Sequence, residues 1–164
     1  MSKTVRVERD GELALIVVHN PPVNTITAEV RAGLKEAVSS VRADGVIRGV
    51  ILICEGNTFF SGADIGEFSG PPRETEYRAL FNSIEALDVP VVAAMHGTVM
   101  GGGLEIALAC HYRVAAPGTR FALPEVTLGI IPGAGGTQRL PRLIGAAKAL
   151  EFILSARPVG APQA

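Results

Sequence analysis

The residues best suited to chemistry are three consecutive glycines followed closely by a glutamate. The segment Gly101-Gly102-Gly103-Leu104-Glu105 leads from an apolar strand, expected over residues 91–95, into an apolar helix. Glycine permits positive φ and lets another group approach its N–H closely. At a helix start these N–H groups lack intrahelical partners and feel the positive end of the helix dipole. The loop is therefore predicted to bind an anion or a developing oxyanion.

Glu105 is the one charged residue on a helix that is otherwise apolar nearly all round, a pattern typical of a buried helix. A carboxylate is rarely buried without a partner, and burial raises its pKa. A raised pKa suits a group that exchanges protons, so we interpret Glu105 as a candidate catalytic residue. The alternative is a helix N-terminal glutamate that the dipole stabilises by about 0.3–1 kcal/mol.

Three further segments carry similar signals. Gly62 follows a buried strand expected over residues 50–54 and is again a place where backbone N–H groups can be offered to a ligand. Taken alone, it also fits an ordinary turn before a helix capped by Asp64. Glu125 follows Pro124 between apolar residues, which equally fits a first-turn helix glutamate. The glycine-rich loop over 132–139 matches neither a dinucleotide-binding GxGxxG nor a P-loop.

Strands and helices alternate along the chain, which indicates an α/β fold with a largely parallel sheet. A hairpin is expected over residues 4–18, with its turn at Asp10-Gly11. Thr27 is expected to cap a helix with an apolar face and an opposite polar face that carries Arg31. Another helical face is expected over 77–87, a strand over 112–116 and a helix over 146–156. No further element is expected after Gly160.

Composition and length restrict the class of protein. With 164 residues, 48% hydrophobic and 19% charged, the chain is expected to fold as one globular domain. A net charge of −1 argues against nucleic acid or an acidic membrane as the main partner. Cys54 and Cys110 lie in apolar runs and are expected to be buried free thiols. With no signal peptide and no apolar stretch long enough to span a membrane, we expect a cytosolic protein.

Five motifs that occur in a fixed order along the chain form a pattern specific enough to compare with known families. They are Asn20-Pro21-Pro22-Val23-Asn24, Phe60-Ser61-Gly62-Ala63-Asp64-Ile65, His96-Gly97 through Gly101-Gly102-Gly103-Leu104-Glu105, Leu123-Pro124-Glu125 and Pro132-Gly133-Ala134-Gly135-Gly136-Thr137-Gln138-Arg139-Leu140. Nearly the whole chain resembles the crotonase superfamily, specifically the enoyl-CoA hydratase/isomerase family. The short linker between Asp64 and Val91 and the residues 109–113 are most similar to the hydratase part of bifunctional hydratase/3-hydroxyacyl-CoA dehydrogenases.

The resemblance implies a fold and a set of site residues. The fold is a spiral of repeated ββα units, here one crotonase-like domain over residues 1–164. The backbone N–H groups of Ala63 and Gly102 are implied to hold a thioester carbonyl oxygen. Glu105 and Glu125 are implied to flank the alkene. The implied contacts with the CoA thioester come from Val23, Asn24, Thr25, Ser61, Gly62, Asp64, Ile65 and Gly101. No metal, NAD or other cofactor is implied, because coenzyme A is part of the substrate.

The implied activity is that of a hydratase, which adds water across the 2,3 double bond of a 2-enoyl-CoA in fatty-acid β-oxidation or related acyl-CoA metabolism. Two carboxylates of different protonation state suit this reaction. One alternative is an enoyl-CoA isomerase that uses the second glutamate alone. Another is a non-catalytic acyl-CoA-binding protein or a truncated assembly fragment.

The chain differs from the family pattern at its end. Family members usually continue with helices that cover the acyl pocket and build a trimer interface, whereas this sequence stops before them. We therefore expect an apolar patch where those helices would dock. A homo-oligomer, trimer or hexamer, is expected if the full-length protein has them.

Overall fold

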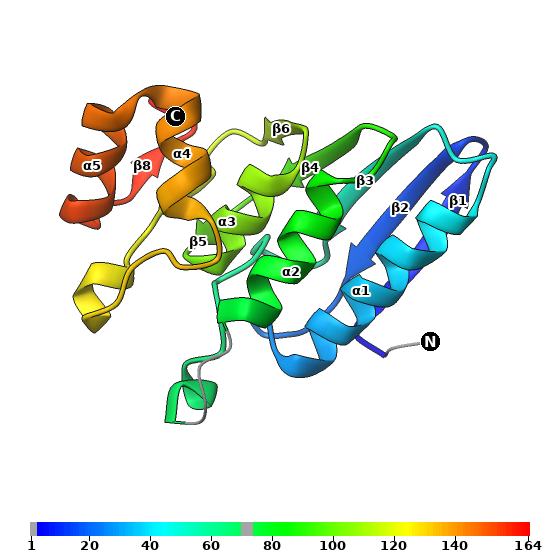
Figure 1. Ribbon diagram of the computed structural model, residues 1–164, viewed down its shortest axis with the longest axis horizontal. Coiled ribbons are helices and arrows are strands. Elements are labelled where there is room, and N and C mark those ends of the chain that lie inside the picture. Colours follow the sequence, from blue (N-terminus) through cyan, green and yellow to red (C-terminus); the bar gives the residue numbers. More distant parts are fainter. Residues whose placement is uncertain (1–2, 70–73) are drawn as a thin grey trace.

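The chain forms two sheets with helices packed against them (Figure 1). The computed structural model describes residues 3–69 and 74–164, and in these residues the larger sheet has the order β1-β2-β3-β4-β6 and the smaller one β5-β7-β8. The strands are β1 (Val5–Asp10), β2 (Leu13–Val18), β3 (Gly49–Cys54), β4 (Val91–Met95), β5 (Thr98–Met100), β6 (Tyr112–Ala115), β7 (Arg120–Ala122) and β8 (Val159–Gly160). The helices are α1 (Ala28–Ala43), α2 (Glu74–Glu85), α3 (Gly102–Ala109), α4 (Gly136–Ile144) and α5 (Ala146–Ser155), with short 3₁₀ helices η1 (Ile65–Ser69) and η2 (Glu125–Leu128).

A ββα unit repeats along the chain. Each unit contributes one strand to the larger sheet, then an extended segment in or next to the smaller sheet, then a helix. The third unit is β4-β5-α3 and the fourth is β6-β7 followed by α4. In the first two units the second strand is reduced to an isolated β-bridge. Ile26 pairs with Ala63, and Phe60 pairs with Val99, both in parallel. The predicted spiral of ββα units is confirmed.

The helices cover the larger sheet in chain order. Figure 1 shows α1 and α2 side by side in front of this sheet, and α2 also contacts α3, which in turn contacts α4. The strands β2, β3, β4 and β6 are parallel, whereas β1 pairs antiparallel with β2 as the predicted hairpin. The parallel strands are apolar because the helices bury them. The side chains of Phe59, Phe60 and Ile106 are fully buried in the core between these elements.

Helix α1 begins where the sequence predicts. The side chain of Thr27 accepts a hydrogen bond from the backbone N–H of Val30, which satisfies one N–H at the helix start. The apolar face of the helix is buried, as expected from its spacing. The residues of the next predicted face, between 77 and 87, are likewise buried along α2 and just after it.

The expectation that Arg31 lies on the exposed face of α1 is wrong, because α2 packs beside α1 and covers it. Arg31 is only 6% exposed. Its guanidinium lies 2.9 Å from the carboxylate of Glu67, donates to the hydroxyl of Tyr77 at 3.0 Å and lies over the Tyr77 ring. A buried charge is tolerated when it is paired and hydrogen-bonded in this way.

Several short elements were not predicted. β5 follows β4 where a loop is expected, and α4 forms at the glycine-rich loop. β7 and β8 pair antiparallel over residues to which the sequence assigns no element. Strands of two or three residues are too short to show an alternating pattern. Their hydrogen-bond partners are distant in sequence, as in the pairing of Val99 with Phe121.

The start of α3 packs directly on the chain of the second unit. A Cβ added at Gly103 would lie 2.6 Å from the Cβ of Phe60 and would also overlap the Phe60 carbonyl. Such contacts are too short to exist without moving backbone. Gly103 is therefore required by the close approach of these two units, and this approach brings the N-terminus of α3 beside the 60–63 segment.

We predict that Gly103→Ala lowers the free energy of unfolding by about 2–3 kcal/mol, because the added methyl group overpacks a site lined by backbone. Gly45→Ala is the matched control, since a Cβ there meets no atom within 4 Å. Urea unfolding followed by circular dichroism measures both. Equal stability of the two variants would contradict the packing described for Gly103.

Candidate active site

The backbone N–H of Ala63 points away from the first unit and toward the third. Ile26 donates its N–H to the carbonyl of Gly62 at 2.9 Å. In a planar trans peptide the C=O and the following N–H point in opposite directions, so the N–H of Ala63 points away from Ile26. Gly62 has φ +118, a conformation that other residues rarely adopt. Glycine at this position therefore aims the Ala63 N–H.

Gly102 supplies a second N–H at the same place. It is the first residue of α3, so its N–H has no partner within the helix, and Gly101 before it has φ +53. A Cβ added at Gly102 would lie 3.5 Å from the nitrogen of Ala63. The two predicted oxyanion donors are thus neighbours, at the positive end of a helix dipole.

Glu105 lies one turn into α3 and is only 4% exposed. Its Oε1 accepts a hydrogen bond of 2.8 Å from the backbone N–H of Gly136, the first residue of α4. The charged residue that stands out on this apolar helix is therefore a buried carboxylate held by a backbone donor from the next unit. Glu105 also lies in the first turn of α3, as the alternative of a helix N-terminal glutamate expects, but its burial distinguishes it from a glutamate on a surface helix.

Glu125 begins η2, directly after β7 and Pro124, and is 8% exposed. A Cβ added at Gly101 would lie 3.2 Å from its Oε1, so the carboxylate packs against the triple-glycine loop. Its Oε2 is buried, and no hydrogen-bond partner for it exists among residues 3–69 and 74–164. An unpartnered buried carboxylate oxygen is costly unless a ligand or water satisfies it.

Both glutamates have raised pKa values. Burial raises the pKa of Glu105 to about 7, the hydrogen bond from Gly136 opposes this rise, and the negative charge of Glu125 adds to it. The backbone of Ala134 and the positive charge of Arg139 make smaller opposing contributions. Burial also raises the pKa of Glu125. With a pKa of about 7, Glu105 can both take up and release a proton at physiological pH.

These groups line one cleft of about 1080 Å³. Its lining includes Ala63, Gly102, Glu105 and Glu125, together with the predicted residues Ser61, Gly62, Ile65 and Gly101. The exposed apolar side chains of Leu128, Ile130 and Ile131 add an apolar wall. The cleft can therefore hold an apolar ligand whose polar centre meets two N–H donors and two carboxyl groups.

The other predicted binding residues do not line this cleft. Val23 and Thr25 lie next to it, since Ser61 donates its N–H to the Val23 carbonyl and its hydroxyl lies 3.3 Å from that of Thr25. The buried Asn24 side chain donates to the carbonyls of residues 55 and 58 at 2.8 and 2.7 Å, so it supports this loop. Asp64 accepts from the N–H of Gly66 and caps η1. Their contact with a CoA group stays a prediction.

The glycine-rich loop over 132–139 has a role that the sequence did not reveal. The loop supplies the Gly136 N–H to Glu105, and its Arg139 lines the cleft. The sequence did mark this loop, since it contains a second run of glycines that matches no phosphate-binding motif. What the sequence could not indicate is that this loop folds over the first glutamate.

Neither a cluster of metal ligands nor a membrane-spanning helix is found in the part of the chain that the structure describes. There, no three or more His, Cys, Asp or Glu side chains gather in a way that could hold a metal ion. None of the helices in that part has both the length and the apolar character needed to cross a membrane. Cys54 and Cys110 are buried and free, as predicted.

Known proteins share this sequence and fold. The chain is 49% identical over 152 residues to a protein of Danio rerio named peroxisomal bifunctional enzyme, with 93% of this chain and 21% of that protein covered. It is 41% identical over 162 residues to a probable enoyl-CoA hydratase of Bacillus subtilis, with 94% and 63% covered. The crystal structure of an enoyl-CoA hydratase from Bacillus anthracis matches with a TM-score of 0.91 at 33% identity, covering 98% of this chain and 66% of that one.

The chain thus spans about a fifth of the length of the first relative and less than two thirds of the second. Over residues 8–164 it also matches the family model described as Enoyl-CoA hydratase/isomerase. Family, fold and the ordered motifs agree, and the chain belongs to the enoyl-CoA hydratase/isomerase family.

Proposed function

We propose that this chain carries the catalytic centre of an enoyl-CoA hydratase, which adds water across the 2,3 double bond of a 2-enoyl-CoA thioester. One observation carries the proposal: two buried carboxyl groups, Glu105 and Glu125, line the same cleft as two neighbouring backbone N–H donors. The thioester would place its carbonyl oxygen at Ala63 and Gly102 and its alkene between the glutamates.

The N–H donors suit the charge that this reaction develops. When water adds to the β-carbon of an enoyl thioester, negative charge moves to the thioester oxygen as an enolate. Two preorganised N–H groups at a helix start stabilise that charge without reorganising, and loss of one such donor costs about 2.7–4 kcal/mol in a comparable site. The rest of the CoA group supplies binding energy that orients the alkene.

The glutamates suit the proton transfers. Hydration needs a base that takes a proton from water as its oxygen bonds to C3, and an acid that gives a proton to C2. Burial raises the pKa of both groups, that of Glu105 to about 7, and a pair of neighbouring carboxyl groups of this kind can hold one carboxylate and one carboxylic acid. Oε2 of Glu125, which has no hydrogen-bond partner among the described residues, provides an acceptor for the water between them.

A second candidate is an enoyl-CoA isomerase. It is favoured by the different surroundings of the two carboxyl groups. Glu105 already accepts the Gly136 N–H, whereas Oε2 of Glu125 is unpartnered in the described part of the chain. Glu125 alone could then move a proton between C2 and C4 of a 3-enoyl-CoA.

Location and assembly stay predictions. Free Cys54 and Cys110 support the proposed cytosolic, reducing location, although the Danio rerio relative is named a peroxisomal enzyme. The proposed homo-oligomer is supported by exposed apolar side chains at Leu143, Leu150 and Leu154 on α4 and α5. The acyl-CoA partner is proposed from the cleft and the family.

We predict that a double-mutant cycle separates the two reactions. If both glutamates hold one water, Glu105→Gln and Glu125→Gln each cripple hydration of crotonyl-CoA, measured as loss of enoyl absorbance. The double variant then loses far less than the product of the single losses, because the groups act as a unit. Isomerisation of a 3-enoyl-CoA is measured in parallel.

An isomerase gives a different result in the same cycle. Only Glu125→Gln then reduces isomerisation strongly, while Glu105→Gln is mild. A mild effect of Glu105→Gln on hydration, in a variant with an intact circular dichroism spectrum, would remove Glu105 from the catalytic residues.

We predict that Gly102→Pro lowers activity by about 10²-fold or more, because it removes one oxyanion donor. Proline is tolerated at the first position of a helix, so the variant should fold. Gly102→Ala keeps the N–H and should lose less activity than the proline variant. Turnover by folded Gly102→Pro at the level of the alanine variant would contradict the oxyanion assignment.

We predict that Glu105 makes the chain less stable as pH rises. Burial raises its pKa from the ordinary value of 4.5 to about 7, so the folded chain holds the proton more tightly than the unfolded chain does. The associated stability is complete below pH 4.5 and is lost as pH rises through 7. Between about pH 5 and pH 8 the wild type should lose about 2 kcal/mol more unfolding free energy than Glu105→Gln.

The control for this comparison is Glu36→Gln, which removes an exposed carboxylate on α1. It should follow the wild-type dependence in urea unfolding at the two pH values. If Glu105→Gln shows the same loss as Glu36→Gln, Glu105 does not hold its proton in the folded chain.

A further inference from the structure

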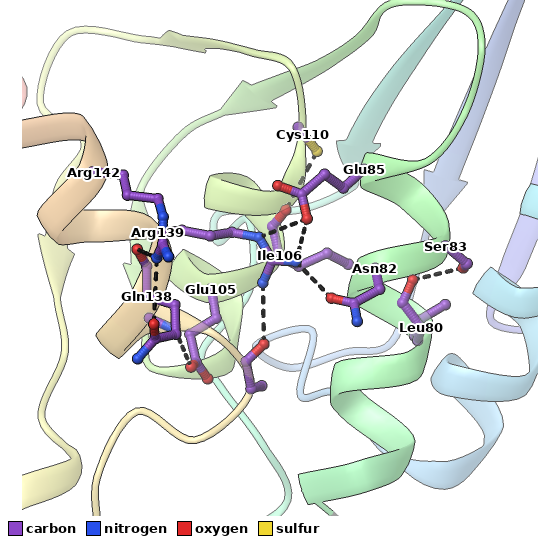
Figure 2. Close-up of polar contacts among 12 residues, drawn as sticks. Leu80, Asn82, Ser83, Glu85, Glu105, Ile106, Cys110, Gln138, Arg139 and Arg142 are labelled. Carbon is purple, nitrogen blue, oxygen red and sulfur yellow. Dashed lines mark hydrogen bonds and ion pairs between the residues drawn. The ribbon is translucent and has the colours of Figure 1, made fainter.

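Arg139 lies between α2 and the loop beside Glu105, and it contacts both. Figure 2 shows its guanidinium directed at Glu85 and Asn82 on α2. Nη2 donates to Oε2 of Glu85 at 2.6 Å and to Oδ1 of Asn82 at 2.8 Å. Nη1 donates to the carbonyl of Ala134 at 3.3 Å. One side chain, 13% exposed, thus ties the loop over 132–136 to a helix of another unit.

The loop is shaped around this guanidinium. A Cβ added at Gly135 would overlap Nη1 of Arg139, and Gly135 has φ +126. The carbonyl of Gly135 accepts the backbone N–H of Arg139 at 2.8 Å. The next residue, Gly136, is the donor to Oε1 of Glu105. Arg139 therefore packs against the residue that precedes the N–H holding the catalytic carboxylate.

The charged groups around Glu105 come from three neighbouring elements. Glu125 faces it from η2 and Arg139 from α4. Glu85, on α2, meets the Arg139 guanidinium and partly balances its charge. β5, which also packs against α3, has no titratable side chain. Arg139 is thus the positive group that acts on Glu105 from this side.

We propose that Arg139 is a positioning residue: by holding the 132–136 loop against α2, it fixes the Gly136 N–H that orients the Glu105 carboxylate. This inference rests on the proposed hydratase function for its kinetic consequence. Its structural consequence, the fixed hydrogen bond between Gly136 and Glu105, is independent of which reaction the cleft performs.

Three variants distinguish whether Arg139 acts by holding the loop in place or by its positive charge. Arg139→Met removes the charge and every guanidinium contact. Arg139→Lys keeps the charge but cannot reach the loop carbonyl and both α2 side chains together. Arg142→Met is the matched control, because the Arg142 guanidinium is on the same helix and donates to the carbonyl and side chain of Gln138, within α4.

Three measurements are made on the full chain. They are the hydrogen-exchange rate of the Gly136 amide, the NMR titration of the Glu105 carboxyl group, and kcat and KM for crotonyl-CoA. Both Arg139 variants should speed exchange of the Gly136 amide and lower kcat by about 10- to 100-fold with little change in KM. Both Arg139 variants should also make Glu105 titrate at higher pH, because both loosen the Gly136 hydrogen bond that lowers its pKa, and Arg139→Met should shift it further, because it also removes the positive charge. Arg142→Met should match wild type in all three.

The inference is overturned if the Gly136 amide exchanges at the wild-type rate in the Arg139 variants, or equally fast in Arg142→Met. If Arg139→Met does not fold, Arg139→Lys decides the question by the same exchange rate. Failure of the proposed function has a separate signature, since the wild type would then not hydrate crotonyl-CoA. The exchange and titration results would still support or contradict the positioning role.

Discussion

The site depends on the parallel register of three short segments that run side by side, two of which are strands of the smaller sheet. Phe60 pairs with Val99 and Val99 with Phe121, each from a successive ββα unit. Three residues after Phe60 comes the N–H of Ala63, and three residues after Val99 comes the N–H of Gly102. Glu125 follows Phe121 by four. Because parallel segments end at the same edge, the donors and one carboxylate converge without any of them being close in sequence.

Glycines allow the units to approach closely enough to bring the two N–H donors next to each other. Gly103 lets the start of α3 rest on the backbone of Phe60, and Gly62 turns the peptide so that the Ala63 N–H faces Gly102. The same packing buries Glu105, whose carboxylate is stabilised by the Gly136 N–H from the following unit. Burial raises the pKa of this carboxyl group to about 7, so the packing that forms the fold also supports the proposed proton transfers.

Sequence reasoning located what depends on local pattern. The cap at Thr27, the apolar helix faces and the unusual charge at Glu105 all follow from residues within one or two helical turns, and the structure agrees. It missed what depends on contacts between distant units. Arg31 is buried because α2 lies over it, and β8 exists because β7 offers an open edge. The donor to Glu105 comes from 31 residues further along the chain, which no local pattern indicates.

The most direct test is a crystal structure of this chain with butanoyl-CoA, a saturated thioester that cannot be hydrated. The central claim is that Ala63, Gly102, Glu105 and Glu125 act on one thioester. It predicts a carbonyl oxygen about 2.7–3.1 Å from both backbone nitrogens, with a water between the two carboxyl groups beside C3. A thioester oxygen turned away from both N–H groups, or an acyl chain bound outside this cleft, would contradict it.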